Sequence, residues 1–199
     1  MKMPHARLAV ILGAFAAGAL LCFAGLTLLL GPTGSGGVVQ AARIGGPFRL
    51  TDQNGKVVTD QDMKGKPFLV FFGFTHCPDV CPTTLFDVSE VMRSLGPDAN
   101  RTAALFITVD PERDTVGSLK DYLTSFDPHL RGLTGDPDAL ATVAKEYRVY
   151  YRKVPLDGGD YTMDHTAIVY LMDKEGRFVS PFNLKRKPEA SAEELRKYL

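Results

Sequence analysis

Cysteine, tryptophan and excess charge are all scarce in this chain. Of its 199 residues, three are cysteine and none is tryptophan, while 23 Lys and Arg residues balance 23 Asp and Glu residues. The balanced charge provides no basic surface of the kind that binds nucleic acid and no acidic block typical of a disordered tail. The sequence also shows no catalytic triad, no nucleotide-binding glycine loop and no paired catalytic carboxylates. These absences favour a protein other than an enzyme, although thiol–disulfide chemistry stays open.

Charge is absent altogether from one stretch near the N-terminus. Residues 8–30 contain no charged side chain and are mostly apolar. About 20 residues of helix span a bilayer core, whereas the apolar part of a secretory signal is shorter, roughly 7–15 residues. Lys2 and Arg7 precede the run, and the first acidic residue is Asp52. The sequence therefore predicts one uncleaved transmembrane anchor, with its N-terminus in the cytoplasm and the rest of the chain outside.

Glycine is concentrated after this run. Residues 31–46 read GPTGSGGVVQAARIGG, a composition typical of a flexible linker. The folded domain is then expected over residues 47–199. The short basic N-terminus lacks an Arg- and Ser-rich presequence, which favours a bacterial inner-membrane protein with its domain in the periplasm. Two cysteines in such an oxidising compartment form a disulfide by default.

The domain alternates apolar runs with helical periodicity. Asn54–Gly55 marks a hairpin, and Asp136–Pro137 is a helix start with proline at the first helical position. Ser191 and Glu194 are spaced for a capping box at the last helix. We expect strands at 67–74, 103–109 and 165–173, and helices at 82–95, 115–126, 136–147 and 191–199.

This alternation predicts an α/β domain with a mixed sheet flanked by helices. A buried strand leads into two cysteines at a helix start, and a hairpin follows late in the chain. That order suggests a thioredoxin-like fold, preceded by the N-terminal transmembrane helix. Ligands of such sheets gather where strands end and helices begin.

Two of the cysteines lie in the stretch GFTHCPDVCP, residues 73–82. Cys77 and Cys81 have an i, i+4 spacing, so their sulfur atoms lie on one face if a helix begins there. A structural disulfide, a dithiol oxidoreductase and a metal site all remain open. Thioredoxin-like enzymes place two residues between the cysteines and carry a cis-proline before the late hairpin. Here three residues intervene, and no proline occurs between Pro155 and Pro181.

His165 is expected at the start of the strand that follows the late loop. Two thiolates and one imidazole form a soft set of three donors, which suits Cu(I), zinc or an iron–sulfur cluster. Structural zinc and clusters normally take four protein ligands, so three donors favour copper. Of the acidic residues, Asp79 lies at a helix start and Asp110 follows a central strand in VDPERDT, where a charged rim could steer a partner.

Three segments together resemble the Sco/SenC family of copper-binding proteins of cytochrome c oxidase assembly. They are FFGFTHCPDVCPTTL (71–85), TVDPERDT (108–115) and DHTAIVYLMDKEGRF (164–178), and the resemblance covers roughly residues 45–199. It implies a thioredoxin-like fold and the copper ligands Cys77, Cys81 and His165. It also implies, more weakly, a docking or neighbouring role for Asp79, Asp110 and Asp164.

The resemblance further implies delivery of copper to the binuclear copper centre of cytochrome c oxidase subunit II. The cargo is expected to be Cu(I), with Cu(II) as a further state. The Cys77–Cys81 disulfide cannot donate thiolates, so the chain needs a thioredoxin-like reductant as well as a copper donor. Some members of the family are proposed to be thiol–disulfide reductants or redox sensors, and this remains the alternative function.

Overall fold

The computed structural model describes residues 15, 18–23, 25–26 and 43–199. It divides into two units, residues 1–41 and 42–199, and the fold below is that of the second unit. The predicted anchor at 8–30 and the predicted linker at 31–46 lie largely outside the described residues. Among those that are described, no helix combines the length and apolar character needed to cross a bilayer.

The second unit is built on a seven-stranded mixed sheet in the order β2-β1-β5-β4-β3-β8-β9. β3 pairs in parallel with β4, and β4 with β5, while the remaining pairs are antiparallel. Every residue of β3 is buried, as expected of a central strand covered on both faces. The strands are β1 (Arg49–Asp52), β2 (Val57–Thr59), β3 (Phe68–Gly73), β4 (Ala103–Thr108), β5 (Leu130–Thr134), β8 (Val169–Met172) and β9 (Phe178–Pro181).

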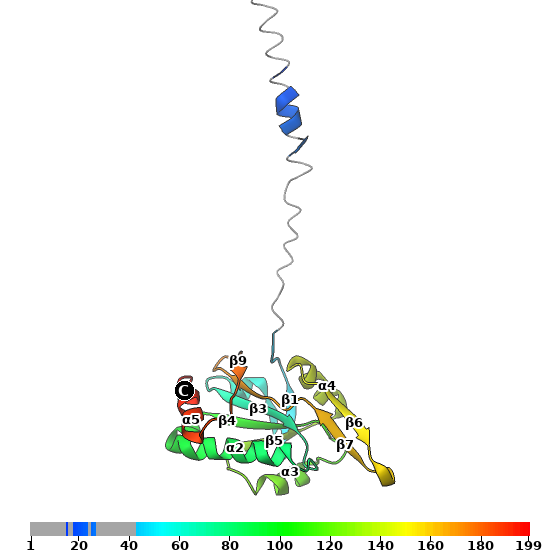
Figure 1. The fold of residues 1–199 in the computed structure, drawn as a ribbon, viewed down its shortest axis with the longest axis vertical. Helices are drawn as coiled ribbons and strands as arrows, with labels where there is room; N and C mark the ends of the chain where they lie inside the picture. Colours follow the sequence, from blue (N-terminus) through cyan, green and yellow to red (C-terminus); the bar gives the residue numbers. More distant parts are fainter. Residues whose placement is uncertain (1–14, 16–17, 24, 27–42) are drawn as a thin grey trace, which may run out of the picture. The chain divides into compact units, whose positions relative to one another are not determined.

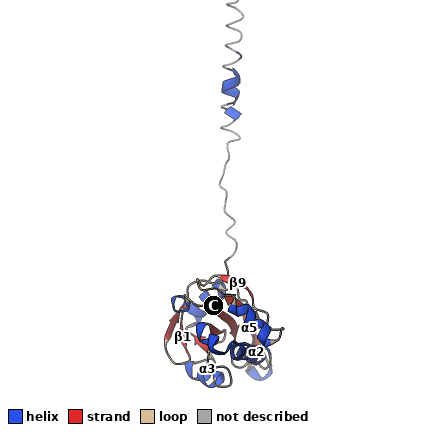
Figure 2. Ribbon diagram, turned by 90° about the vertical axis from the view of Figure 1, so that its left-hand side faces the viewer, coloured by secondary structure: helices blue, strands red, loops and turns tan. Residues whose placement is uncertain are grey.

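Helices cover both faces of this sheet (Figure 1). On one side lie α2 (Val80–Leu95), α3 (Val116–Leu123) and α5 (Pro188–Arg196), and α4 (Pro137–Glu146) lies on the other. Figure 2 shows α2 and α5 side by side, and these two helices pack against each other. Short 3-10 turns complete the unit at Asp60–Met63, Gly96–Arg101 and Asp157–Gly159. The predicted mixed α/β sheet flanked by helices is confirmed.

Aromatic side chains fill the core on both sides of the sheet. Phe71 stacks on Phe106 at a ring separation of 6.1 Å on the side of α2. Phe72 faces the opposite way and contacts Tyr147 at 5.4 Å, just beyond the end of α4. Successive residues of β3 thus supply opposite layers, as the alternation of a strand requires.

A second, two-stranded sheet changes the expected environment of His165. β6 (Tyr151–Pro155) and β7 (Tyr161–His165) form a hairpin in which Tyr151 pairs with His165. The predicted continuous strand at 165–173 is therefore wrong at its start, because His165 ends β7 and β8 begins only at Val169. The backbone amide of Thr166 donates to the carbonyl of Tyr150 at 2.9 Å, which continues the hairpin pairing one residue beyond β7.

Local helix signals had mixed outcomes. The Asp136 side chain accepts a hydrogen bond from the Ala139 amide at 2.8 Å, so the predicted cap of α4 is confirmed. The predicted capping box at Ser191 is wrong, because α5 begins at Pro188 and buries Ser191 in its interior. The Ser191 hydroxyl instead donates to the carbonyl of Asn183 at 2.9 Å. Strand β5 carries no alternating pattern long enough to predict it, and the sequence analysis missed it.

Candidate metal centre

The two cysteines lie where the central strand β3 leads into helix α2. β3 ends at Gly73, and the segment 74–79 forms a tight loop in which the Cys77 amide donates to the Phe74 carbonyl at 3.3 Å. Cys81 occupies the first turn of α2, which begins at Val80. The pair thus spans a loop and a helix start, and the loop turns the Cys77 side chain back towards the helix.

The sulfur of Cys77 faces the start of the helix. The backbone amide of Cys81 lies 3.4 Å from Cys77 Sγ and donates towards it. Cys77 is 8% exposed and Cys81 is fully buried, and both are free thiols. This contact holds the Cys77 sulfur against the first turn of α2, beside Cys81.

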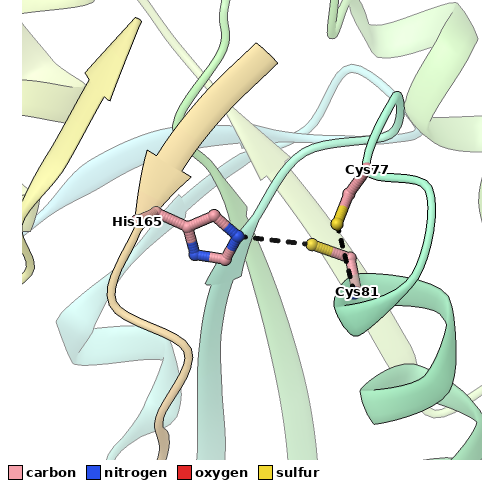
Figure 3. A group of neighbouring side chains, drawn as sticks. All are labelled: Cys77, Cys81 and His165. Atoms are coloured by element: carbon pink, nitrogen blue, oxygen red, sulfur yellow. Dashed lines mark hydrogen bonds between the residues drawn. The ribbon is translucent and has the colours of Figure 1, made fainter. Parts of the chain in front are cut away.

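His165 approaches the pair from the end of β7 (Figure 3). Its Nε2 atom lies 3.6 Å from Cys81 Sγ, and its Nδ1 atom lies 3.2 Å from the carbonyl oxygen of Thr166. A carbonyl only accepts hydrogen bonds, so in the neutral ring Nδ1 carries the proton and Nε2 presents its lone pair to the sulfur atoms. The rings of Phe71 and Phe74 pack edge-on against the imidazole at 6.2 and 5.8 Å and restrict its rotation.

Burial shifts the pKa values of Cys81 and His165 in opposite directions. It raises the pKa of the Cys81 thiol, because the thiolate is poorly solvated there. It lowers the pKa of the His165 imidazole, because the charged ring is disfavoured. The free protein at neutral pH therefore holds a protonated Cys81 and a neutral His165, and an incoming metal ion displaces the thiol proton.

The three donor atoms form a compact group. Sγ of Cys77, Sγ of Cys81 and a ring nitrogen of His165 lie within 4.8 Å of one another, and no fourth His, Cys, Asp or Glu joins them among the described residues. Donors that share one ion at bond lengths of roughly 2.0–2.3 Å lie roughly 3.5–4 Å apart. Small side-chain adjustments suffice to close the group around an ion. Its donor chemistry, two soft sulfurs and one imidazole, suits copper.

The three acidic residues singled out in the sequence occupy different environments. Asp79 is exposed at the N-cap of α2, and Asp164 is exposed on β7 with Arg152 at 3.7 Å. Asp110 is 2% exposed and accepts hydrogen bonds from Arg113 and Tyr161. Its contacts are internal, so Asp79 and Asp164 are the members of this set that can meet a partner directly.

Four residues around the site escaped the sequence analysis. A Cβ atom on Gly73 would lie 2.8 Å from Cys81 Sγ, so only glycine leaves room for that sulfur. Thr75, Arg113 and Tyr161 belong to a hydrogen-bonded network beside the site. Arg113 lies within the motif VDPERDT that the sequence singled out, but its partner Tyr161 lies 48 positions away and carried no local signal.

Fold and site together define the class of protein as a thioredoxin-like α/β domain with a Cys-Cys-His centre at the end of its central strand. A SCO1/SenC family model matches residues 37–199. The chain belongs to the SCO1/SenC family.

Solved structures agree with this assignment. Bradyrhizobium japonicum ScoI with copper bound is 67% identical, with a TM-score of 0.77, and the match covers 78% of this chain and 99% of that one. Arabidopsis thaliana ScoI with copper bound is 39% identical with a TM-score of 0.71, and the match covers 78% and 97% of the two chains. Both support the thioredoxin-like fold and show that structures of this family hold copper.

Curated relatives include proteins of bacteria and of mitochondria. A SCO2-like protein of Rickettsia conorii is 40% identical over 77% of this chain and 76% of its own length. The mitochondrial protein SCO1 homolog 1 of Arabidopsis thaliana is 44% identical over 69% of this chain, but only 42% of its own length is matched.

Proposed function

We propose that this chain is a copper carrier that delivers its ion to the binuclear copper centre of cytochrome c oxidase subunit II. The observation that carries the proposal is the three-donor group of Cys77, Cys81 and His165. Two thiolates and a neutral imidazole satisfy Cu(I) without a fourth protein ligand. The copper-bound relatives and the resemblance to oxidase assembly proteins support the same cargo and the same recipient.

The geometry of the group suits transfer as well as binding. Cys77 retains slight exposure at the edge of the group, whereas Cys81 lies fully buried behind it. An incoming thiolate of the recipient can approach the ion from the side of Cys77, while Cys81 and His165 still hold it. Release then proceeds by ligand exchange, with each donor of the carrier replaced by a donor of the recipient.

We further propose that the domain lies in the periplasm and works with a copper donor and a reductant. An anchor at residues 8–30 in a bacterial inner membrane would hold the domain in the periplasm, next to a membrane-bound oxidase. A copper donor loads the site, and a thioredoxin-like dithiol keeps Cys77 and Cys81 reduced. A reporter that is active only after export, fused to the C-terminus, tests the orientation. An inactive reporter on a membrane-bound protein would show the opposite orientation, with the domain in the cytoplasm.

Copper retention and oxidase activity test the function itself. The reduced full chain, kept free of oxygen, is expected to hold about one equivalent of Cu(I) against a competing chelator. A deletion strain is expected to lose cytochrome oxidase activity most severely at low copper. Added copper should restore the activity in part, because mass action can replace a carrier but not a structural subunit. Normal oxidase activity at limiting copper in the deletion strain would contradict the proposal.

A second candidate is a thiol–disulfide reductant, and the contrast between the two cysteines favours it. The slightly exposed Cys77 lies in the loop before α2 with its sulfur facing the helix start, and Cys81 is buried in the first turn of that helix. In this reaction the two thiols lose two electrons and two protons to form the Cys77–Cys81 disulfide, and the partner disulfide becomes two thiols. Oxidised thiols on the recipient, in a deletion strain whose oxidase activity does not respond to copper, would support this function over copper delivery.

A further inference from the structure

The motif that follows β4 lies between the two halves of the metal centre. We define residues 110–115, DPERDT, as the bridging loop. One half of the centre is the cysteine segment after β3, and the other is the hairpin β6–β7, which carries His165 at its end. The loop contacts both halves through different carboxylates.

Asp114 holds the cysteine segment. It is fully buried, and its Oδ1 atom accepts a hydrogen bond from the Thr75 hydroxyl at 2.5 Å. Its Oδ2 atom accepts from the Thr75 amide at 3.0 Å and from the Thr108 hydroxyl at 2.6 Å. Thr75 lies two residues before Cys77, and Thr108 ends β4, so this carboxylate ties the start of the cysteine segment to the central sheet.

Asp110 and Arg113 hold the histidine hairpin. Asp110 Oδ1 accepts a hydrogen bond from the Tyr161 hydroxyl at 2.9 Å, and its Oδ2 accepts from Arg113 Nε at 2.5 Å. Arg113 Nη1 donates to the Tyr161 carbonyl at 3.0 Å, and its guanidinium lies 3.8 Å from the centre of the Tyr161 ring. Burial and the bond to Asp110 raise the pKa of Tyr161 to about 12, so its hydroxyl remains a donor at every physiological pH.

The hairpin depends on such contacts for its position. β6 and β7 form a sheet of their own, separate from the seven-stranded sheet. An isolated two-stranded hairpin is only marginally stable in water. Tyr161 and His165 are the first and last residues of β7, and their even separation places both side chains on the same face of the strand. Fixing Tyr161 against Asp110 therefore restrains the first residue of the strand whose last residue, His165, approaches the sulfur atoms.

We propose that the bridging loop sets the position of His165 relative to Cys77 and Cys81, with Tyr161 and Asp110 as positioning residues for the third copper ligand. The inference rests on the proposed function only in taking copper as the cargo. When the loop and hairpin are joined, the ion meets three donors. When the Tyr161–Asp110 bond is lost, the hairpin moves more freely and the ion depends more heavily on the two sulfur atoms.

A double-mutant cycle on the full chain separates positioning from general structural damage. Tyr161→Phe removes the hydroxyl and retains the ring under the guanidinium. In the wild-type background it should weaken Cu(I) binding by about three- to tenfold, within the range of coupling between residues of one network. In a His165→Ala background the same substitution should leave affinity unchanged, because the ligand that it positions is already gone. An equal loss in both backgrounds overturns the proposal, and so does the absence of any loss in the wild-type background.

X-ray absorption of the copper-loaded protein supplies a second readout. Tyr161→Phe should weaken the imidazole contribution to the spectrum or lengthen the copper–nitrogen distance. The contributions of the two sulfur atoms should stay unchanged. Asp110→Asn keeps the shape of the side chain but weakens its bond to Tyr161 of the hairpin and its bond to Arg113, so it should alter the imidazole signal in the same direction. An unaltered imidazole signal in both variants contradicts the proposal.

Glu112→Gln is the matched control. Glu112 belongs to the same loop and pairs with Lys153 of the same hairpin at 2.7 Å, but both side chains are largely exposed. Exposed pairs contribute little to stability, so this variant should retain wild-type copper affinity and spectrum. All of these measurements use purified protein and added Cu(I). If the protein fails to deliver copper to an oxidase but Tyr161→Phe and His165→Ala remain coupled in the cycle, only the proposed function is refuted. If the two substitutions lower copper affinity additively, only the positioning role is refuted.

Discussion

Cys81 Sγ and His165 Nε2 lie 3.6 Å apart, although 84 positions separate the two residues in the sequence. Cys81 is placed by a helix start and His165 by the end of a hairpin strand. The contact joins two elements that the chain builds independently. The metal centre is therefore completed by tertiary structure, and substitutions on either side are expected to affect copper differently.

The two cysteines are expected to matter more than the histidine. Cys77→Ser or Cys81→Ser should abolish tight Cu(I) binding, because a single thiolate remains. His165→Ala should weaken binding by more than about tenfold without abolishing it, since two thiolates can still hold Cu(I). Competition against a Cu(I) chelator measures both effects. His129→Ala is a suitable control, because His129 is engaged with Asp127 and Asn100 instead. A His165→Ala variant with wild-type affinity would show that the third ligand is misassigned.

Copper uptake should weaken as pH falls. Burial raises the pKa of the Cys81 thiol, so the free protein carries this proton throughout the neutral range and must release it when the metal binds. Apparent affinity should therefore fall about tenfold per pH unit for each thiol proton released. The lowered pKa of His165 keeps the imidazole neutral to a lower pH than a free histidine, so the thiols dominate this dependence near neutrality. Chelator competition between pH 6 and 8 gives the slope of apparent copper affinity against pH. A flat profile would contradict proton release.

Gly73→Ala should displace the buried sulfur of Cys81. The new Cβ atom would lie 2.7 Å from the Phe106 ring and 2.8 Å from Cys81 Sγ, in a region where both are buried. Overpacking of this kind costs about 1–3 kcal/mol of unfolding free energy. Displacement of the sulfur should also lower copper affinity.

Gly117→Ala in α3 is the matched control for this substitution, because its Cβ atom would meet only the Thr115 hydroxyl at 3.8 Å. Alanine in a helix should stabilise the protein slightly there and leave copper binding unchanged. Thermal unfolding and chelator competition on both variants distinguish the two expectations. Equal behaviour of the two alanine variants would count against a steric limit at Gly73.

Asp79→Lys should slow the transfer of copper to its recipient. Asp79 is exposed at the start of α2, two residues from each cysteine, so its charge lies at the edge of the site. Charge reversal should reduce the association rate most at low ionic strength, and leave copper affinity nearly unchanged. Asp121→Lys on the exposed side of α3 controls for the change in net charge. Stopped-flow transfer at two salt concentrations measures the effect, and equal slowing by both variants would exclude a local docking role for Asp79.

Local interactions let the sequence determine much of the fold. The central strands could be recognised because both of their faces are buried, which leaves uninterrupted apolar runs such as FLVFFG. The cap at Asp136 could be recognised because it is formed by a side chain and an amide three residues apart. The cysteine spacing is likewise local, and it identified the position and the soft chemistry of the site.

Only the tertiary structure decided how the third donor reaches that site. The sequence placed His165 at the start of a continuous strand. In the structure His165 is the last residue of β7, paired with Tyr151, and its ring faces Cys81. The bond between Tyr161 and Asp110 joins residues 51 positions apart, and no local pattern encodes it. Such contacts form only after the sheet has brought strand ends together, because their partners are selected by burial and geometry in the folded chain rather than by neighbours in sequence.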